Sequence, residues 1–120
     1  MTTSGPLKYD SEKVRLELIP PEFIMATGRG LTYGSVKYSA GNWATGDGFN
    51  YSRLYGALQR HLTSWANGTD NDPESGLNHL DHASCMLAFL VAHVGRNLGV
   101  DDRVSVGIAP RVSEIPVVTT

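Results

Sequence analysis

The amino-acid sequence predicts an all-α domain, a small bundle of three to four helices with an extended N-terminal arm and an extended C-terminal tail. The chain has 120 residues, of which 41% are hydrophobic and 18% charged, as in a single globular domain. Apolar residues recur with helical spacing in successive central segments, whereas apolar and polar residues alternate at the two ends. We therefore expect one all-α domain over residues 1–98 and an extended or flexible tail over residues 99–120.

The first helix is expected over residues 21–38. Pro21 suits the first turn of a helix, where an N–H group would have no partner, and Glu22 matches the positive end of the helix dipole. We expect this helix to be irregular near Gly28 and Gly30.

The second helix is expected to start at a cap formed by Asn50 or Ser52 and to end near Gly68. Arg53 and Arg60 are seven positions apart and therefore share one face of this helix. Its apolar residues step at i, i+4, i+8 and i+11: Leu54, Leu58, Leu62 and Trp65.

The third helix is predicted to start with Asp72 as N-cap and Pro73 in its first turn, and to run to Gly99. Its apolar residues follow helical spacing: Leu80, Ala83, Leu87, Leu90, Val91, Val94 and Leu98.

The start of this third helix also carries candidate metal ligands. His79 and His82 are one turn apart, and Glu74 lies eight residues before His82, close to the same side. With Asp72 or Asp70 they form a set of oxygen and imidazole ligands, which suits Mg, Mn or a harder transition metal. A structural interpretation stands beside this one, because Asp72 also fits a plain helix start and such histidines are often hydrogen-bonded residues at the edge of a core.

Three basic residues are candidates for binding phosphate: Lys37, Arg53 and Arg60. Solvated surface charge is the alternative for each of them. Asn42 and Trp43 lie in a glycine-rich loop, an unusual place for a large aromatic residue unless it covers something. This loop is a candidate lid or wall, with a place in the core as the alternative for Trp43.

Composition argues against several classes of partner. The net charge is −2 and no run of basic residues is present, so duplex nucleic acid is not an expected partner. The single Cys85 excludes an intrachain disulfide, and no apolar stretch approaches the roughly 20 residues needed to span a bilayer. We therefore expect a cytoplasmic protein, and a homo-oligomer, because a domain this small buries only a modest share of its surface.

The ordered succession of motifs in residues 15 to 92 closely resembles the phage dATP/dGTP diphosphohydrolase domain, a relative of the MazG-like all-α NTP pyrophosphohydrolases. The motifs that carry the resemblance are Leu18–Glu22, Leu31–Tyr38, Asn42-Trp43, Tyr51–Leu62 and Asp72–Ala83.

The resemblance implies a bundle of MazG-like type that hydrolyses a purine deoxynucleoside triphosphate to the monophosphate and pyrophosphate, shaping a phage nucleotide pool in the host cytoplasm. It implies dGTP as the preferred substrate, with dATP and GTP as further candidates, a divalent Mg or Mn cofactor, and a homodimer or homotetramer. With this resemblance, the expected catalytic residues are Glu74, Lys37 and Arg60. The expected metal ligands are Asp72, Glu74, His79, His82 and His61. The expected substrate-binding residues are Tyr33, Lys37, Asn42, Trp43, Arg53 and Arg60.

One departure from the MazG-like pattern affects the metal ligands. Those enzymes typically hold metal with a Glu-rich motif on one helix and Glu-x-x-Asp on the next, yet between Glu22 and Asp70 this chain has only Asp47. His79 and His82 occupy the Glu and Asp places of the second motif, so either imidazole replaces carboxylate or the site shifts toward the residues before them. A non-catalytic oligomeric module that binds a nucleotide or a partner is the alternative function. A histidine-aspartate phosphohydrolase ranks last, because its adjacent His-Asp order is reversed here.

Overall fold

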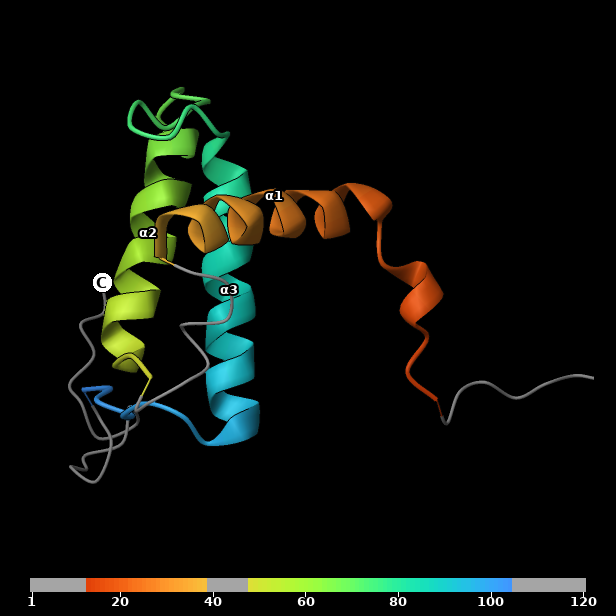
Figure 1. The fold of residues 1–120 in the computed structure, drawn as a ribbon, viewed down its shortest axis with the longest axis vertical. Helices are drawn as coiled ribbons and strands as arrows, with labels where there is room; N and C mark the ends of the chain where they lie inside the picture. The colour runs from red at the N-terminus through yellow and green to blue at the C-terminus, as the bar shows by residue number, and fades with distance from the viewer. Residues whose placement is uncertain (1–12, 39–47, 105–120) are drawn as a thin grey trace, which may run out of the picture.

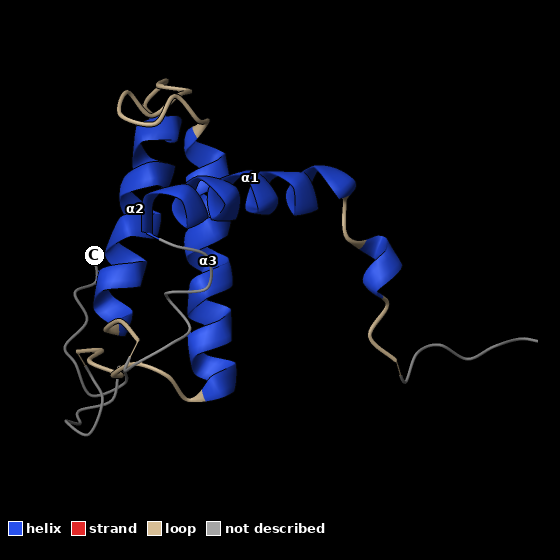
Figure 2. Ribbon diagram, viewed as in Figure 1, coloured by secondary structure: helices blue, strands red, loops and turns tan. Residues whose placement is uncertain are grey.

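The computed structural model describes residues 13–38 and 48–104. They form a 3₁₀ helix, η2 (Leu16–Leu18), and three α-helices, α1 (Pro21–Tyr38), α2 (Tyr51–Ala66) and α3 (His79–Arg96). No strand forms within these residues, as Figure 2 shows. The predicted small all-α bundle is therefore confirmed, with three α-helices in the described part of the chain.

The helices α2 and α3 form an antiparallel pair, and α1 packs across this pair against α3 (Figure 1). The loop of residues 67–78 joins α2 to α3 at one end of the pair. The first half of α1 and η2 project away from the other two helices (Figure 1). Large apolar side chains on this projecting part are exposed: Leu16, Leu18, Phe23, Ile24 and Met25.

The bounds of α1 match the prediction, but the predicted irregularity near Gly28 and Gly30 is wrong, because the helix runs through both residues. Gly30 is buried where α1 crosses α3. A Cβ atom at this position would lie 2.6 Å from the carbonyl oxygen of Asp81 and 2.6 Å from the Cβ of Cys85. The glycine therefore permits a close approach of two helices and does not mark a break in one of them.

The start of α2 follows the first of the two predicted caps. Asn50 is the N-cap, but its side chain makes no capping hydrogen bond. The carboxylate of Asp102, beyond α3, accepts hydrogen bonds from the backbone N–H of Ser52 at 2.8 Å and from its hydroxyl. The helix ends at Ala66 with Asn67 as C-cap, close to the predicted end. A residue from the far end of the described chain thus satisfies the first turn of α2.

The predicted N-cap of α3 at Asp72 is wrong by six residues. Asn78 is the N-cap, and its side-chain oxygen accepts a hydrogen bond of 2.8 Å from the backbone N–H of Leu80. Asp72 caps a separate turn, in which its Oδ1 accepts from the N–H groups of Glu74 and Ser75 at 2.7 and 3.0 Å. Gly76 then takes a φ of 78°, which ends the turn before a helix can propagate.

The end of α3 also differs from the prediction. The helix stops at Arg96, and Asn97 takes the left-handed conformation as C-cap with a φ of 56°. Gly99, the predicted end, lies beyond the helix with a positive φ of 74°. The next residue, Val100, pairs with Asn50 in an isolated bridge, so the chain turns back toward the start of α2. The boundary at residue 98 between the domain and the C-terminal tail stays a prediction, and residues 105–120 lie outside the described part of the chain.

The interior of the described residues combines a few apolar side chains with a buried histidine. Leu54, Ala83 and Cys85 are the buried apolar residues, and burial raises the pKa of the Cys85 thiol to about 11. His93 is fully buried, with Nδ1 at 2.8 Å from the Phe89 carbonyl and Nε2 accepting from the Phe49 N–H at 3.1 Å. Because Phe49 precedes α2, this histidine joins the N-terminal end of α2 to the C-terminal end of α3.

Among the described helices, none has the length and apolar character that crossing a membrane requires.

Candidate functional site

Three side chains with metal-ligating atoms meet where α2, the start of α3 and the loop between them come together. The Nδ1 atoms of His61 and His79 are 2.9 Å apart, and Asp72 Oδ2 lies 3.9 Å from the His61 Nδ1. One ligand atom from each residue lies within 4.8 Å of the other two. We call His61, Asp72 and His79 the histidine–aspartate cluster.

Each member of the cluster is held by its own local structure. His61 lies in the third turn of α2, and its ring is partly buried. His79 is the first residue of α3 and is only 5% exposed, and its backbone N–H donates to the carbonyl of Asp70 at 2.8 Å. Asp72 is fixed by the turn that it caps, and its backbone N–H donates to the carbonyl of Leu77 at 2.8 Å. Backbone hydrogen bonds at Asp72 and at His79 therefore hold the loop in place beside the cluster.

His82 lies beside the cluster but has a different partner. Its ring stacks on the His61 ring, with centroids 4.6 Å apart and planes 15° apart. Its Nε2 is 2.7 Å from the hydroxyl oxygen of Ser75, which also accepts the N–H of Leu77 at 3.1 Å. His79 and His82 thus leave the same end of α3 and both lie against His61, but their polar partners differ. Ser75 is not among the site residues expected from the sequence.

The electrostatics of the cluster favour a neutral His61 imidazole beside an ionised Asp72 carboxylate. Burial lowers the pKa of His61, and the nearby charges of His82 and His79 lower it further. Burial also lowers the pKa of His82. Burial acts to raise the pKa of Asp72, but hydrogen bonds from the backbone N–H groups of Ser75 and Glu74 bring it below its ordinary value. These are the protonation states that bind a cation.

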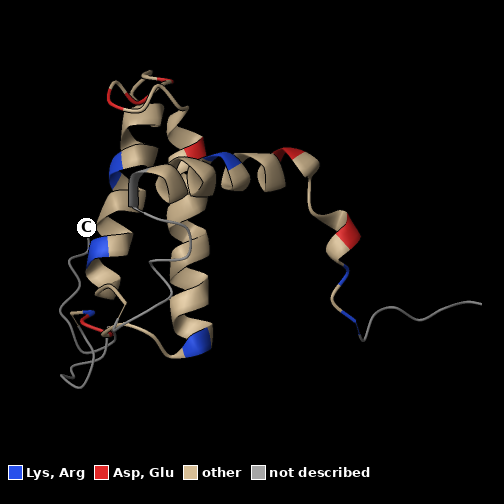
Figure 3. Ribbon diagram, in the orientation of Figure 1, with Lys and Arg blue, Asp and Glu red and all other residues tan. Residues whose placement is uncertain are grey.

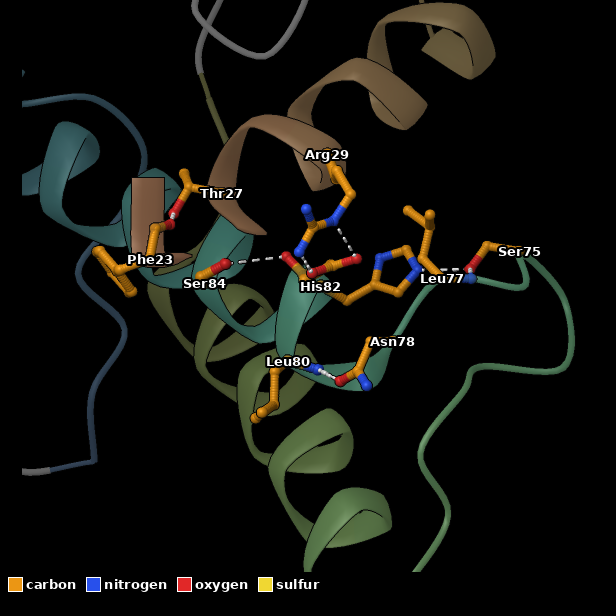
Figure 4. A network of polar contacts seen from close by, with 10 residues as sticks. Phe23, Thr27, Arg29, Ser75, Leu77, Asn78, Leu80, His82 and Ser84 are labelled. Atoms are coloured by element: carbon orange, nitrogen blue, oxygen red, sulfur yellow. Dashed lines mark hydrogen bonds and ion pairs between the residues drawn. The ribbon is translucent and has the colours of Figure 1, made fainter. Parts of the chain in front are cut away.

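An ion pair between α1 and α3 lies next to this region (Figure 4). The Arg29 guanidinium donates from Nε to Asp81 Oδ2 and from Nη2 to Asp81 Oδ1, both at 3.0 Å. Asp81 is only 4% exposed, whereas the side chain of Arg29 is 50% exposed. The hydrogen bond and the charge of Asp81 raise the pKa of Arg29. The sequence does not indicate this pair, because 52 residues separate its members and no local pattern joins them.

A groove of about 460 Å³ opens beside the ion pair. It lies along one face of α1 and reaches the loop before α3, and its lining residues are Met25, Gly28, Arg29, Thr32, Tyr33 and Leu77. The Tyr33 ring meets the His82 ring edge-on, with centroids 5.6 Å apart and planes 88° apart. The groove is therefore connected to the histidine–aspartate cluster through two ring contacts, Tyr33 with His82 and His82 with His61.

The remaining predicted site residues lie in several places. Glu74 is exposed on the turn beside Asp72, outside the trio of converging ligand atoms. Arg60 is exposed on α2 next to His61, whose pKa its charge lowers. The Arg53 guanidinium carbon lies 5.4 Å from the centre of the Phe49 ring, toward the far end of α2. The loop between α2 and α3 carries acidic residues, and others lie on η2, α1 and α3 and in the segment after α3 (Figure 3).

Three predicted site residues cannot be placed by their side chains. Lys37 belongs to the last turn of α1, but its side chain lies outside the described part of the structure. Asn42 and Trp43 lie wholly outside the described residues. Their assignments to the substrate site stay predictions, as do the roles of all the residues proposed as ligands.

Comparison with known proteins connects these residues to a family. Residues 3–103 match the family described as dATP/dGTP diphosphohydrolase, N-terminal. The chain is also 34% identical over 108 residues to a protein of Salmonella phage PMBT28 named dATP/dGTP diphosphohydrolase. That match covers 90% of this chain but spans only 36% of the relative's length. No solved structure matches the chain. Because the family match runs through all three helices and the cluster, the chain belongs to the dATP/dGTP diphosphohydrolase N-terminal family.

Proposed function

We propose that this chain carries the site for metal-dependent hydrolysis of a purine deoxynucleoside triphosphate, with dGTP preferred, giving the monophosphate and pyrophosphate. Membership of the family and the name of the phage relative support the substrate class. The observation that carries the proposal is the convergence of His61, Asp72 and His79 from two helices and a fixed loop.

The chemistry of the cluster fits a divalent cation. Two imidazole nitrogens and one carboxylate oxygen lie close enough together to face one ion, and the lowered pKa values of His61 and Asp72 favour the ligating forms of these two residues. Bound Mg²⁺ or Mn²⁺ would supply positive charge against the charge that develops on the phosphates during reaction. The residues that would hold the ion are His61, His79 and Asp72, with Glu74 and His82 adjacent.

The chain's other residues would then bind and orient the substrate. Arg60 lies next to His61 on α2, where a guanidinium can hold the triphosphate through paired hydrogen bonds. Glu74 is exposed on the same turn as Asp72, and its carboxylate is proposed as the group that accepts a proton from the attacking water. Lys37, at the end of α1, is proposed as a second cation for the phosphates. Positioning and charge are expected to supply most of the catalysis of phosphoryl transfer.

The direct test is to incubate the protein with dGTP and Mg²⁺ or Mn²⁺ in ¹⁸O-labelled water and to separate the products. We expect dGMP and pyrophosphate, with the ¹⁸O in dGMP because water attacks the α-phosphorus. Excess EDTA should abolish turnover. Release of inorganic phosphate with dGDP, or no turnover of any purine triphosphate, would overturn the proposal.

A double variant separates this function from a non-catalytic nucleotide-binding module. His61→Ala with His79→Ala removes both imidazoles of the cluster, so activity should fall by at least about a hundredfold if the cluster binds the essential metal. Arg15→Met changes an exposed arginine whose ion-pair partner among the described residues is Glu17, and this variant serves as the control. Unchanged activity in the double variant would exclude a catalytic role for the cluster.

We also propose that the protein assembles as a homodimer or homotetramer. Large apolar side chains remain exposed on η2 and the first half of α1, and further ones line α3: Leu87, Val91 and Val94. Exposed apolar surface of this kind is usually covered by another chain. Light scattering coupled to gel filtration measures the mass in solution, and a monomer at micromolar concentration would contradict this proposal.

A further inference from the structure

The groove beside the Arg29–Asp81 ion pair has the size and lining of a nucleobase site. Its volume of about 460 Å³ is within the usual range of small-molecule pockets, roughly 300–1,000 Å³. Met25, Tyr33 and Leu77 give it apolar surface for the faces of a flat ring, whereas Arg29 is its charged residue. Resting on the proposed function, we propose that this groove binds the purine base and that Arg29 selects a 6-oxopurine, guanine or hypoxanthine, over adenine.

The hydrogen bonds of Arg29 determine which edge of its guanidinium is available. Asp81 accepts from Nε and Nη2, which are the two donors on one edge of the planar group. Nη1 makes no hydrogen bond to the described part of the chain, and Nη2 keeps a second hydrogen. Within residues 13–38 and 48–104, the edge formed by Nη1 and Nη2 therefore has no hydrogen-bond partner, while the Asp81 carboxylate fixes the plane of the group. This is a preorganised pair of donors on a half-exposed side chain.

Such a pair of donors matches guanine and not adenine. The O6 and N7 atoms of guanine are adjacent acceptors, which arginine contacts with two hydrogen bonds. Adenine presents N7 beside the N6 amino group, whose hydrogens would face the guanidinium donors. One hydrogen bond is then lost and two donor groups oppose each other, so discrimination of about 5- to 150-fold is expected.

The location of the groove suits a nucleotide that also reaches the histidine–aspartate cluster. Tyr33 lines the groove and contacts the His82 ring, which stacks on His61 of the cluster. The centroids of the Tyr33 and His82 rings are 5.6 Å apart and those of His82 and His61 are 4.6 Å apart, so two neighbouring ring contacts join the groove to the cluster. Gly28 adds to the space, because no atom lies within 4 Å of where its Cβ would be.

Base analogues test the inference on the unaltered protein. The ratio of kcat/KM for dGTP to that for 2-aminopurine deoxyriboside triphosphate tests the 6-oxo group, because both carry the 2-amino group and only dGTP carries the oxygen at C6. We expect dGTP and dITP to be hydrolysed about 5- to 150-fold better than dATP and the 2-aminopurine analogue. The analogue 7-deaza-dGTP, which lacks N7, should fall between them. Equal turnover of dATP and dGTP would overturn the inference and the preference for dGTP, but it would leave metal-dependent hydrolysis of purine deoxynucleoside triphosphates standing.

Variants then assign the preference to Arg29. Arg29→Lys keeps a positive charge against the buried Asp81 but loses the second donor edge, so the preference for dITP should fall at least about fivefold. Arg29→Gln combined with Asp81→Asn replaces the ion pair with two amides, and glutamine should shift the preference toward adenine. Arg15→Met is the control, with no expected change in the ratio. Circular dichroism and thermal unfolding establish that each variant is folded, and a folded Arg29→Lys protein with an unchanged ratio would overturn the assignment.

Binding provides a readout that does not depend on catalysis. Saturation-transfer NMR with dGMP, dIMP and dAMP reports whether the base is held and which base is preferred. If no triphosphate is hydrolysed but dIMP binds better than dAMP and Arg29→Lys removes this difference, the groove assignment stands and the proposed function falls. If neither monophosphate is distinguished from the other, the assignment is overturned whatever the activity.

Discussion

The crossing of α1 over α3 depends on the absence of a side chain at Gly30. A Cβ there would lie 2.6 Å from the Asp81 carbonyl oxygen and 2.6 Å from the Cβ of Cys85, both closer than real Cβ contacts. The first of these atoms is backbone and the second is fixed to it, so rotating a side chain relieves neither overlap. Gly30→Ala must therefore move one helix away from the other.

The expected cost follows from two opposing effects. Alanine is favoured over glycine in a helix by about 0.8–1 kcal/mol, whereas overpacking a tight contact costs typically about 1–3 kcal/mol. Because two overlaps occur together, we take the upper end of that range and expect Gly30→Ala to lose about 2 kcal/mol of unfolding free energy. Gly34 on the same helix has nothing within 4 Å of its Cβ position, so Gly34→Ala should gain up to about 1 kcal/mol.

Urea unfolding followed by circular dichroism measures both variants under the same conditions. A difference of about 3 kcal/mol between them, with equal slopes against urea, is the expected result. Equal stability of Gly30→Ala and Gly34→Ala would refute the close crossing. Displacement of α1 would also move Arg29 relative to Asp81, so Gly30→Ala should weaken the preference among purine bases as well.

Three further predictions follow from individual contacts. Asn78→Ala removes the hydrogen bond that caps α3 and should cost about 1 kcal/mol in urea unfolding, whereas Asn50→Ala should cost less, because that side chain makes no capping bond. The pKa values of His61 and His82 lie below their ordinary 6.5, so these histidines take up protons more readily in the unfolded chain. The metal-free protein should therefore keep its unfolding free energy above about pH 6.5 and lose part of it as the pH falls further. An unfolding free energy in EDTA that does not change with pH would contradict this. Calorimetric titration should show tighter binding of Mn²⁺ than of Mg²⁺, and the reverse order would argue against imidazole ligands.

The sequence predicted the helices where local signals were unambiguous. Pro21 has no N–H to place inside a helix, and it starts α1 in the structure as in the prediction. The start of α3 was harder, because Asp72 and Asn78 are both good cap residues and both do cap a backbone turn. Gly76 takes a positive φ and Asn78 an extended conformation, so the turn and α3 are separate, and the conformation of a glycine cannot be read from the sequence.

The candidate site could be predicted only in part, because its contacts depend on how the helices are placed. The spacing of His79 and His82 correctly indicated that both side chains leave one end of α3. It did not indicate their different polar partners, His61 for His79 and Ser75 for His82. The contact of His79 with His61 depends on the register of α2 against α3. The pair of Arg29 with Asp81 depends on the close crossing of α1, which no periodicity reveals.

The missing acidic motif of the MazG-like pattern can now be considered in terms of donor chemistry. His79 occupies the first of the two positions that carry the second acidic motif in the MazG-like pattern. It lies beside the His61 imidazole from α2 and the Asp72 carboxylate from the loop, so three ligand atoms meet without a carboxylate from α2. Mg²⁺ prefers oxygen ligands and keeps much of its water, whereas Mn²⁺ accepts imidazole nitrogen more readily. A cluster with two nitrogens and one oxygen should therefore favour Mn²⁺ relative to an all-carboxylate site. Replacing His79 by Glu would restore the residue of the MazG-like pattern at that place and should shift the preference back toward Mg²⁺.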